Sequence, residues 1–506
     1  MSLPFQRLKA RIDPGRAAAL LVIVFGLVLR LRQITLNRSF WLDEAMLALN
    51  IVNRNFVGLI RPLDYDQGAP LGFLWVVKAL ESLLGDNEFS LRLFPFLAGC
   101  LGLIVLWRLA RQLIQPVGVV FVLLVFASSQ ILVSYSAQVK QYAVDGTISV
   151  LLQLLALSLL RRDNTRKDYF LLALLGALAI WMSHAAVFTL GGAGLVLFGA
   201  KMGKKDWQSA GKYALVGVFW VLNFAALYLI QYRSLVSNTN LTNYWAEFFM
   251  PLSSAAPLWI LGKLAVLFSA LGGMSDSLPS ALILLLIFAG AISLGQREKA
   301  WVWMFVVTLL LTLAASGLQK YPFGGRMGFF IMPGLLICVG ECIELPRRFF
   351  ASRPALGLAG ALLLTAFLTF TPLSFSIEAA LAPKMTENIA PTMAYLKANV
   401  RQGDVMYLYY TSIPAFRYYA PKYGLENIKV FNGTNAHLGG QPILAQISPL
   451  IGNKRVWFLF SHMTDNEYVA DRDAILVIAK QLGEKKREFG QPGTLINLYL
   501  YSLKAP

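Results

Sequence analysis

Charged residues are scarce in this chain: they make up 14% of its 506 residues, whereas 57% are hydrophobic. A soluble domain carries about a quarter charged residues, so the composition argues against an ordinary cytosolic enzyme. Lys and Arg number 45 against 27 Asp and Glu, which gives a formal net charge of +18. In so apolar a chain, we attribute this excess to cytoplasmic loops of a membrane protein before invoking nucleic acid.

Cysteine is equally scarce. Cys100, Cys338 and Cys342 all lie in apolar segments, and none lies in the polar C-terminal part. The sequence therefore offers no disulfide framework. Cys338 and Cys342 are one helical turn apart, and we interpret them as small packing residues in preference to metal ligands.

Uncharged apolar runs predict a polytopic α-helical membrane protein with about eleven helices that cross a hydrocarbon core of about 30 Å. The first run ends at Arg30-Leu31-Arg32 without a small-residue cleavage pattern, so we interpret it as a helix and not as a signal peptide. The predicted spans are 17–29, 91–107, 117–133, 144–160, 169–183, 187–200, 213–230, 281–294, 301–315, 328–342 and 355–371.

Basic residues between these spans fall in alternate loops, which the positive-inside rule places in the cytoplasm. They are Arg7, Lys9, Arg11, Arg16, Arg108, Arg111, Arg161, Arg162, Arg166, Lys167, Lys201, Lys204, Lys205, Lys212, Arg297, Lys299, Arg347, Arg348 and Arg353. A twelfth span at 257–274 would break this alternation, so we expect that segment to lie in the outer interface or to re-enter the membrane. The N-terminus is then cytoplasmic, and the chain after Pro372 lies outside.

The predicted organisation is a transmembrane domain over 1–372 and a small extracytoplasmic α/β domain over 373–506. In the latter, 404–410, 455–460 and 495–503 have the pattern of strands, and 414–423 and 473–482 are helical or loop segments. Two outer loops, 33–90 and 231–280, are long enough to indicate function. The first contains two apolar or amphipathic pieces, 44–52 and 71–84, which we expect to form helices at the membrane surface.

The strongest local signal is the adjacent pair Asp43 and Glu44, just outside the first span and beside Trp41. Acids at a helix start also complement the helix dipole, but an interfacial tryptophan would hold this pair at membrane level. Farther on, Asp64, Asp66 and Gln67 form a polar turn. The Asp-x-Asp pattern alone is weak evidence for a metal, yet four carboxylates in one outer loop predict the floor of a polar site.

The next outer loop brings Gln138, Gln141 and Asp145 to one helical face, with Lys140 and Tyr142 beside them. Ionisable groups at this level usually mark function; the alternative is a Lys140–Asp145 pair with interfacial tyrosines. In a third loop, Arg326 follows two glycines that allow close approach of a ligand. Its guanidinium suits a phosphate, although it could instead snorkel to lipid headgroups.

His184 adds a polar group at the same face, where a structural histidine is the plainer interpretation. An anion clamp of Lys140 and Arg326 beside Asp43, Glu44 and Asp66 suits a substrate with a lipid tail, a phosphate and a polar head. In such a site, a carboxylate deprotonates an acceptor hydroxyl while the cations stabilise the departing phosphate. The residues alone thus indicate a transfer reaction on a phospholipid-like donor.

Four motifs in this order resemble bacterial membrane glycosyltransferases of the GT-C fold, in the protein O-mannosyltransferase and aminoarabinose-transferase-like superfamily often labelled family 39. The resemblance covers roughly residues 15–345. The motifs are Trp-Leu-Asp-Glu-Ala at 41–45, Asp-Gln-Gly-Ala-Pro-Leu at 66–71, Gln-Val-Lys-Gln-Tyr-Ala at 138–143 and Tyr-Pro-Phe-Gly-Gly-Arg at 321–326.

The resemblance implies a sugar donor on a polyprenyl phosphate, transfer at the outer face of a bacterial cytoplasmic membrane, and inversion at the anomeric carbon. It implies that Asp43 is the catalytic base, with Glu44 orienting acceptor or sugar, and that Lys140 and Arg326 bind the phosphate. We expect Asp66, Gln67, Gln141, Tyr142 and His184 to contact substrate. No metal or other cofactor is required by the pattern, although a divalent metal is compatible with it.

Single displacement also follows from the chemistry, because one base and a phosphate leaving group need no covalent sugar–enzyme intermediate. Expected partners are the lipid-linked sugar, the bilayer and a glycan, lipid or protein acceptor, without nucleic acid. One alternative is an O-antigen-ligase-like or polymerase-like transferase with a diphosphate-linked donor, but its outer loops would be richer in Arg and His. The others are a lipid or glycan transporter, which often shows internal repeats, and a membrane-anchored binding module.

Overall fold

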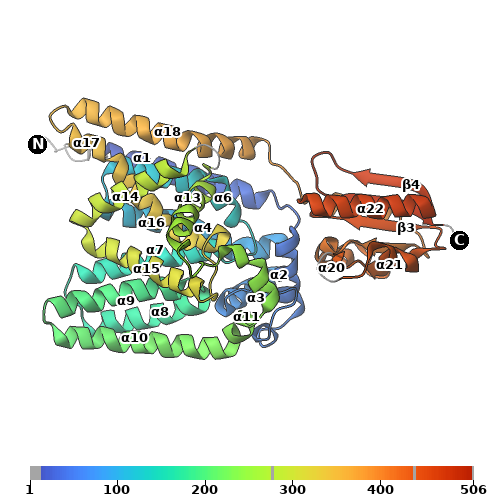
Figure 1. The fold of residues 1–506 in the computed structure, drawn as a ribbon, viewed down its shortest axis with the longest axis horizontal. Coiled ribbons are helices and arrows are strands. Elements are labelled where there is room, and N and C mark those ends of the chain that lie inside the picture. Colours follow the sequence, from blue (N-terminus) through green and yellow to red (C-terminus); the bar gives the residue numbers. More distant parts are fainter. Residues whose placement is uncertain (1–12, 275–277, 437–439, 504–506) are drawn as a thin grey trace, which may run out of the picture.

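The computed structural model describes residues 13–274, 278–436 and 440–503. It shows an elongated helical bundle with a small α/β domain at one end (Figure 1). We call that end of the bundle the domain end. Of the basic residues predicted to be cytoplasmic, Arg7, Lys9 and Arg11 lie outside the described residues.

Nine helical segments of the described chain are long and apolar enough to cross a membrane. They are α1 (Pro14–Thr35), α4 (Glu88–Leu113), α7 (Tyr142–Leu160), α9 (Ala186–Gly203), Trp207–Val236, α14 (Ser280–Arg297), α15 (Lys299–Gly317), Gly325–Phe349 and α18 (Pro354–Leu381). The other two predicted spans are shorter helices, α5 (Pro116–Ser128) and α8 (Arg166–Met182). The predicted polytopic fold is therefore confirmed, with two of its helices shorter than a typical span.

Burial orders the helices from the centre of the bundle to its surface. The most apolar window of Gly325–Phe349 is 94% buried, whereas that of Trp207–Val236 is 22% buried. The first segment comprises η4 (Gly325–Ile331), α16 (Met332–Ile343) and α17 (Leu345–Phe349), and the second comprises α10 (Trp207–Leu227), η2 (Tyr228–Tyr232) and α11 (Arg233–Val236). Thus α16 is the central helix, and α10 presents side chains such as Leu215, Val221 and Leu222 outward, as a lipid-facing helix does.

The helix α5 ends at Ser128, where the sequence predicted a continuous span to 133. Its last carbonyl groups are partly satisfied by Arg30, which donates to the carbonyl oxygens of Phe126 (2.9 Å) and Ala127 (3.4 Å). A new helix, α6 (Gln130–Tyr135), then begins with the hydroxyl of Ser129 as its N-cap. A buried guanidinium thus compensates for the break, because unpaired carbonyls within a membrane are costly.

The helix α13 (Ala256–Gly272) does not cross the bundle. Its Leu271 carbonyl accepts a hydrogen bond from Ser129 at 2.6 Å, and the segment before it bonds to Ser316. Figure 1 shows α13 nearly end-on, while α9, α10 and α18 run across the view.

The predicted surface helices are α2 (Leu42–Asn53) and α3 (Leu71–Leu84), both at the domain end. Further short helices of this end are η1 (Gly58–Ile60), α12 (Thr239–Tyr244) and η3 (Ala246–Phe248). The loops with the candidate site residues also lie there, while the described basic residues that we predicted to be cytoplasmic lie at the opposite end. The structure therefore gathers the two sets at opposite ends of the bundle.

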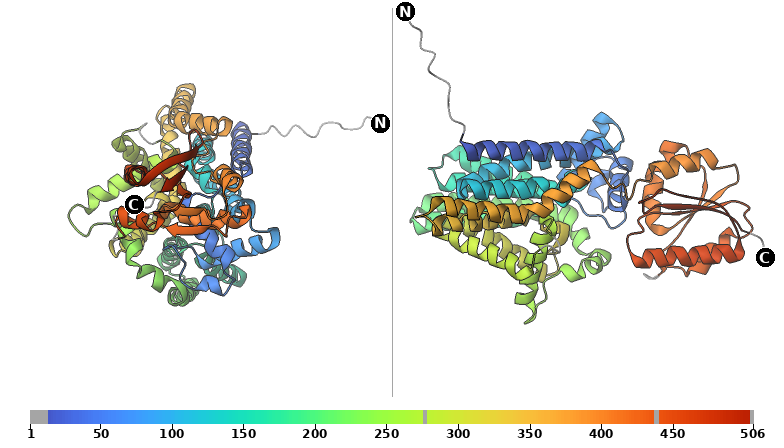
Figure 2. Two further views of the ribbon diagram at one scale, coloured as in Figure 1. Left: turned by 90° about the vertical axis from the view of Figure 1, so that its right-hand side faces the viewer. Right: turned by 90° about the horizontal axis from the view of Figure 1, so that it is seen from above.

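The C-terminal domain has a five-stranded sheet in the order β2-β1-β3-β5-β4. Strands β2, β1 and β3 are parallel, and β5 is antiparallel to both β3 and β4. Its elements are α19 (Ala390–Asn399), β1 (Val405–Leu408), η5 (Tyr410–Ser412), α20 (Ile413–Tyr423), β2 (Lys429–Asn432), α21 (Ile443–Ile447), η7 (Ser448–Leu450), β3 (Val456–Phe460), α22 (Asn466–Leu482), β4 (Gly483–Gly490) and β5 (Asn497–Leu503). The domain lies beyond α2 and α3, and helices pack on both faces of the sheet (Figure 2).

Candidate active site

The acidic pair occupies the first turn of α2, where carboxylates complement the positive end of the helix dipole. Neighbouring residues on a helix point in different directions, so the two carboxylates meet different partners. Asp43 and Glu44 therefore have different roles.

Glu44 is buried and fully engaged. Arg92 donates to both of its carboxylate oxygens, at 2.8 and 2.7 Å, and the backbone N–H of Val139 donates to Oε1 at 2.9 Å. The pair therefore fastens α2 to α4 and to the loop that carries Lys140. Sequence reasoning did not single out Arg92, although a charge at the edge of an apolar span was a usable signal.

Asp43 faces two cations. Its Oδ2 lies 2.5 Å from Nη1 of Arg326 and 3.9 Å from Nζ of Lys140. Burial alone would raise the pKa of Asp43, but the attraction of Lys140 and Arg326 outweighs it and holds that pKa below its ordinary value. The carboxylate is therefore ionised and available as a proton acceptor.

Lys140 is buried between Asp43 and Gln67, and its ammonium donates to Oε1 of Gln67 at 2.7 Å. Burial is the largest influence on this group and lowers the pKa of Lys140 to about 8. The alternative pairing of Lys140 with Asp145 is wrong, because the ammonium is turned toward α2.

Arg326 follows two glycines with positive φ, Gly324 (φ 144°) and Gly325 (φ 51°), which let the chain turn sharply into η4. Its guanidinium carbon lies 5.8 Å from the ring centroids of Trp41 and Tyr142 and 5.4 Å from that of Trp245. Such rings favour a cation over their faces. The side chain is thus held at Asp43 and does not reach for lipid headgroups.

Asp64 and Asp66, two further acids of the first loop, lie apart from this centre. Asp64 is exposed and pairs with Arg54 at 2.8 Å. Asp66, also exposed, accepts hydrogen bonds from Asn238 (2.7 Å) and Asn240 (3.1 Å). Neither contacts Asp43 or its cations, so the expected floor of four carboxylates is wrong. Asp66 instead ties the first long loop to the second.

Several buried polar atoms around the centre have no hydrogen-bond partner within the described chain. They are Trp41 Nε1, Gln138 Oε1, Gln141 Oε1, Asp145 Oδ1, His184 Nε2 and Arg326 Nε. Native proteins leave few buried polar groups unpaired, and each such group costs free energy. Among them, Arg326 pairs with Asp43 and Trp41 lies beside Arg326. Unpaired atoms at these positions are what a site for a polar ligand requires.

His184 lies between α8 and α9 with its ring edge-on to Tyr232, the centroids 4.7 Å apart. Burial lowers the pKa of His184 to about 4. The imidazole is consequently neutral near pH 7, and it can donate or accept a hydrogen bond without carrying charge.

A cavity of about 310 Å³ opens beside this centre. Part of its wall comes from the segment that joins α18 to the C-terminal domain. The lining residues are Arg38, Ser39, Trp41, Glu44, Ser134, Tyr135, Gln138, Arg326, Lys384, Met385, Thr386, Glu387 and Asn388. The cavity is large enough for a sugar-sized group beside Arg326, the ion-pair partner of Asp43. Within the described residues, no three His, Cys, Asp or Glu side chains are grouped to hold a metal ion.

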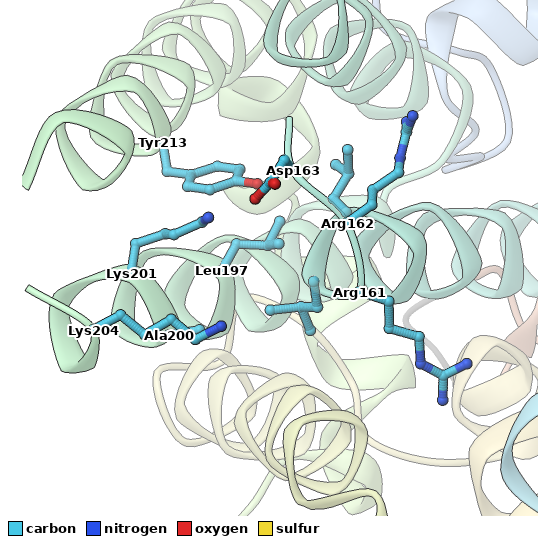
Figure 3. A pocket seen from close by; sticks show the side chains of 10 residues that line it. Arg161, Arg162, Asp163, Leu197, Ala200, Lys201, Lys204 and Tyr213 are labelled. Atoms are coloured by element: carbon cyan, nitrogen blue, oxygen red, sulfur yellow. The ribbon is translucent and has the colours of Figure 1, made fainter. Parts of the chain in front are cut away.

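A second cavity, of about 220 Å³, lies at the opposite end of the bundle between the ends of α7, α9 and α10. Figure 3 shows its side chains, with Lys201 and Lys204 along one helix and Arg161 directed away from the others. Three of its cations already have carboxylate partners, at Glu298, Asp168 and Asp206.

The fold and the site together define a polytopic helical membrane protein with a buried, charged centre beneath a small α/β domain. Residues 68–229 match the family model of dolichyl-phosphate-mannose-protein mannosyltransferases. A comparison with curated protein sequences found no significant match.

Solved structures share the architecture. ArnT from Cupriavidus metallidurans in the apo state is 14% identical with a TM-score of 0.56, over 96% of this chain and 98% of that one. The same protein bound to undecaprenyl phosphate is 13% identical with a TM-score of 0.55, over the same shares. The family model and the shared fold place the chain in the GT-C glycosyltransferase superfamily.

Proposed function

We propose that this protein transfers a sugar from a polyprenyl-phosphate donor to a glycan, lipid or protein acceptor at the outer face of a bacterial cytoplasmic membrane, with inversion. The observation that carries the proposal is the position of Asp43 between Arg326 and Lys140. Arg326 also lines a cavity, and its Nε is one of several unpartnered buried polar atoms of the domain end. One ionised carboxylate and two cations are the groups that this reaction needs.

In the proposed reaction, Asp43 accepts the proton of the acceptor hydroxyl as its oxygen bonds to the anomeric carbon. The bond between that carbon and the phosphate oxygen breaks on the opposite face, and the electron pair leaves with polyprenyl phosphate. Arg326 and Lys140 stabilise the charge that develops on the phosphate. One displacement from the far side inverts the anomeric configuration.

The ion pair between Asp43 and Arg326 explains how the donor activates the base. While the guanidinium is bound to the carboxylate, the pKa of Asp43 is low and the group is a weak base. A donor phosphate competes for Arg326 and Lys140, because a phosphate is a strong partner for both cations. Loss of those partners raises the basicity of Asp43 only when the donor is bound.

The remaining residues take supporting roles in the proposal. Gln141, Tyr142 and His184 contact the sugar or the phosphate, and Gln67 holds Lys140. Asp66 stabilises the loop that carries Gln67. Glu44, whose oxygens are occupied by Arg92 and Val139, orients α2 and does not react.

Undecaprenyl phosphate bound to the similar ArnT supports the choice of lipid phosphate. To test the function, purified protein in detergent is given undecaprenyl-phosphate donors that carry a hexose, a pentose or an amino sugar, together with a cell-envelope extract as acceptor. We expect release of undecaprenyl phosphate from one donor and an inverted linkage in the product by NMR. Consumption of none of these donors, or a retained linkage, contradicts the proposal; consumption without any membrane gradient distinguishes an enzyme from a transporter.

A further inference from the structure

The backbone just before Asp43 is held by the C-terminal domain and its linker. Three N–H groups of this segment donate to them: Ser39 to Asn388 Oδ1 (3.4 Å), Phe40 to the Tyr419 hydroxyl (2.9 Å) and Leu42 to Glu387 Oε2 (3.4 Å). The first N–H groups of a helix have no partner within the helix, and Trp41 supplies no side-chain cap for α2. The carboxylate of Glu387, hundreds of residues away in the sequence, therefore caps the start of α2.

Glu387 is in turn held by His462, in the loop after β3. Nδ1 of His462 lies 2.9 Å from Oε1 and 3.0 Å from Oε2 of Glu387. His462 has φ 61°, a left-handed backbone that costs free energy for a residue with a side chain. Strain of this kind persists where the surrounding structure needs the side chain in one place.

The imidazole of His462 also faces the ring of Trp41, with centroids 6.1 Å apart and an interplanar angle of 31°. The other neighbours of Trp41 include the guanidinium of Arg326. One histidine of the C-terminal domain therefore contacts both a cap of α2 and an aromatic ring beside the principal cation of Asp43.

We propose that His462 is a positioning residue for Asp43, acting through Glu387 and Trp41, and that the C-terminal domain thereby completes the active centre. The inference rests on the proposed function, since it concerns the base of that reaction. His462 takes no part in bond making. It fixes the start of α2, so its loss displaces the carboxylate without removing the phosphate clamp.

The test compares the full-length variants His462→Ala and His462→Asn with wild type, using the donor that wild type consumes. We expect turnover by His462→Ala to fall by about ten- to a hundredfold, since displacement of a catalytic group by about 1 Å has effects of that size. The dissociation constant for undecaprenyl phosphate should stay within about twofold. Asparagine tolerates a left-handed backbone and can donate to Glu387, so His462→Asn should recover most of the lost turnover.

The matched control is Tyr418→Phe, which removes a different bond between the C-terminal domain and the bundle, from the Tyr418 hydroxyl to Asp86 at 2.5 Å. Its turnover should equal that of wild type within about twofold. Amide hydrogen exchange over residues 39–45 should accelerate in His462→Ala and not in Tyr418→Phe.

Equal turnover by His462→Ala and wild type overturns the inference, as does a loss that asparagine fails to restore or that Tyr418→Phe reproduces. The proposed function fails separately, if Asp43→Asn retains sugar transfer. An inactive Asp43→Asn beside a fully active His462→Ala rejects the positioning role alone.

Discussion

The two ends of the bundle both gather cations, yet they use them differently. At the opposite end, Arg161, Arg162 and Lys201 each have a carboxylate partner, in pairs at least partly open to solvent. At the domain end, Lys140 and Arg326 are largely buried and share the single carboxylate of Asp43. Within the described part of the chain, several unpartnered buried polar atoms lie at the domain end, whereas Asn164 Oδ1 is the one such atom beside the charges of the opposite end. The two ends therefore differ more in unmet hydrogen-bonding capacity than in the number of their charges.

The largest effect that separates the two ends should be in stability. Glu44→Gln leaves Arg92 buried without its countercharge, and removing one partner of a buried pair costs about 3–5 kcal/mol. Glu298→Gln, which breaks the partly exposed pair with Arg161, should cost at most about 1 kcal/mol. The free energy of unfolding of both variants is measured in the same detergent. Equal losses of stability would show that the two ion pairs do not differ in strength.

The next effect concerns donor binding. Arg326→Ala should weaken the affinity for undecaprenyl phosphate by about a hundredfold, because loss of a buried charged contact costs about 2–5 kcal/mol. Arg161→Ala, at the opposite end, serves as the matched control and should leave the affinity unchanged. Titration with undecaprenyl phosphate measures both. An equal loss in the two variants would place the phosphate elsewhere.

A smaller effect follows from the pKa of Lys140, which burial lowers to about 8. Phosphate binding needs the protonated amine, so kcat/KM for the donor should fall as pH rises above about 8, by nearly tenfold per pH unit. In Lys140→Arg, this decline should disappear, since a guanidinium keeps its proton. Measurements of kcat/KM from pH 6 to about 10 test this prediction. An identical decline in wild type and Lys140→Arg would show that the decline does not come from Lys140.

The smallest effect is expected at the second cavity. Lys204→Gln removes a cation that lines it (Figure 3). Turnover and donor affinity should both stay within about twofold of wild type, because surface substitutions change free energies by about 0.5 kcal/mol or less. A large loss of turnover would show that this end also takes part in the reaction.

Much of the fold could be predicted from the sequence, because apolar runs and basic loops are local signals. The surface helices at 44–52 and 71–84 correspond to α2 and α3, and the three predicted strands correspond to β1, β3 and β5. The strands β2 and β4 were missed. β4 is mostly exposed and rich in charge, so it has no apolar alternation to detect. The break after Ser128 was missed because its compensation comes from Arg30, on another helix.

The candidate site shows the same division. Asp43, Lys140 and Arg326 could be singled out individually as charges at the edges of spans, and the structure brings them together. Their separation from Asp64 and Asp66 could not be foreseen, because it depends on how the loop folds between α2 and α3. The pairing of Glu44 with Arg92 and the contact of Glu387 with α2 could not be foreseen either, because these residues lie far apart in the sequence.

The role of Asp43 is tested by sugar transfer by Asp43→Asn at saturating donor, with bound undecaprenyl phosphate measured on the same preparation. Asp64→Asn, an equivalent change at an exposed acid of the same loop, is the control. Asp43→Asn should lose at least about a hundredfold in turnover, as loss of a general base does, while it still binds the lipid phosphate. Asp64→Asn should remain active. Undiminished transfer by Asp43→Asn would show that Asp43 is not the base.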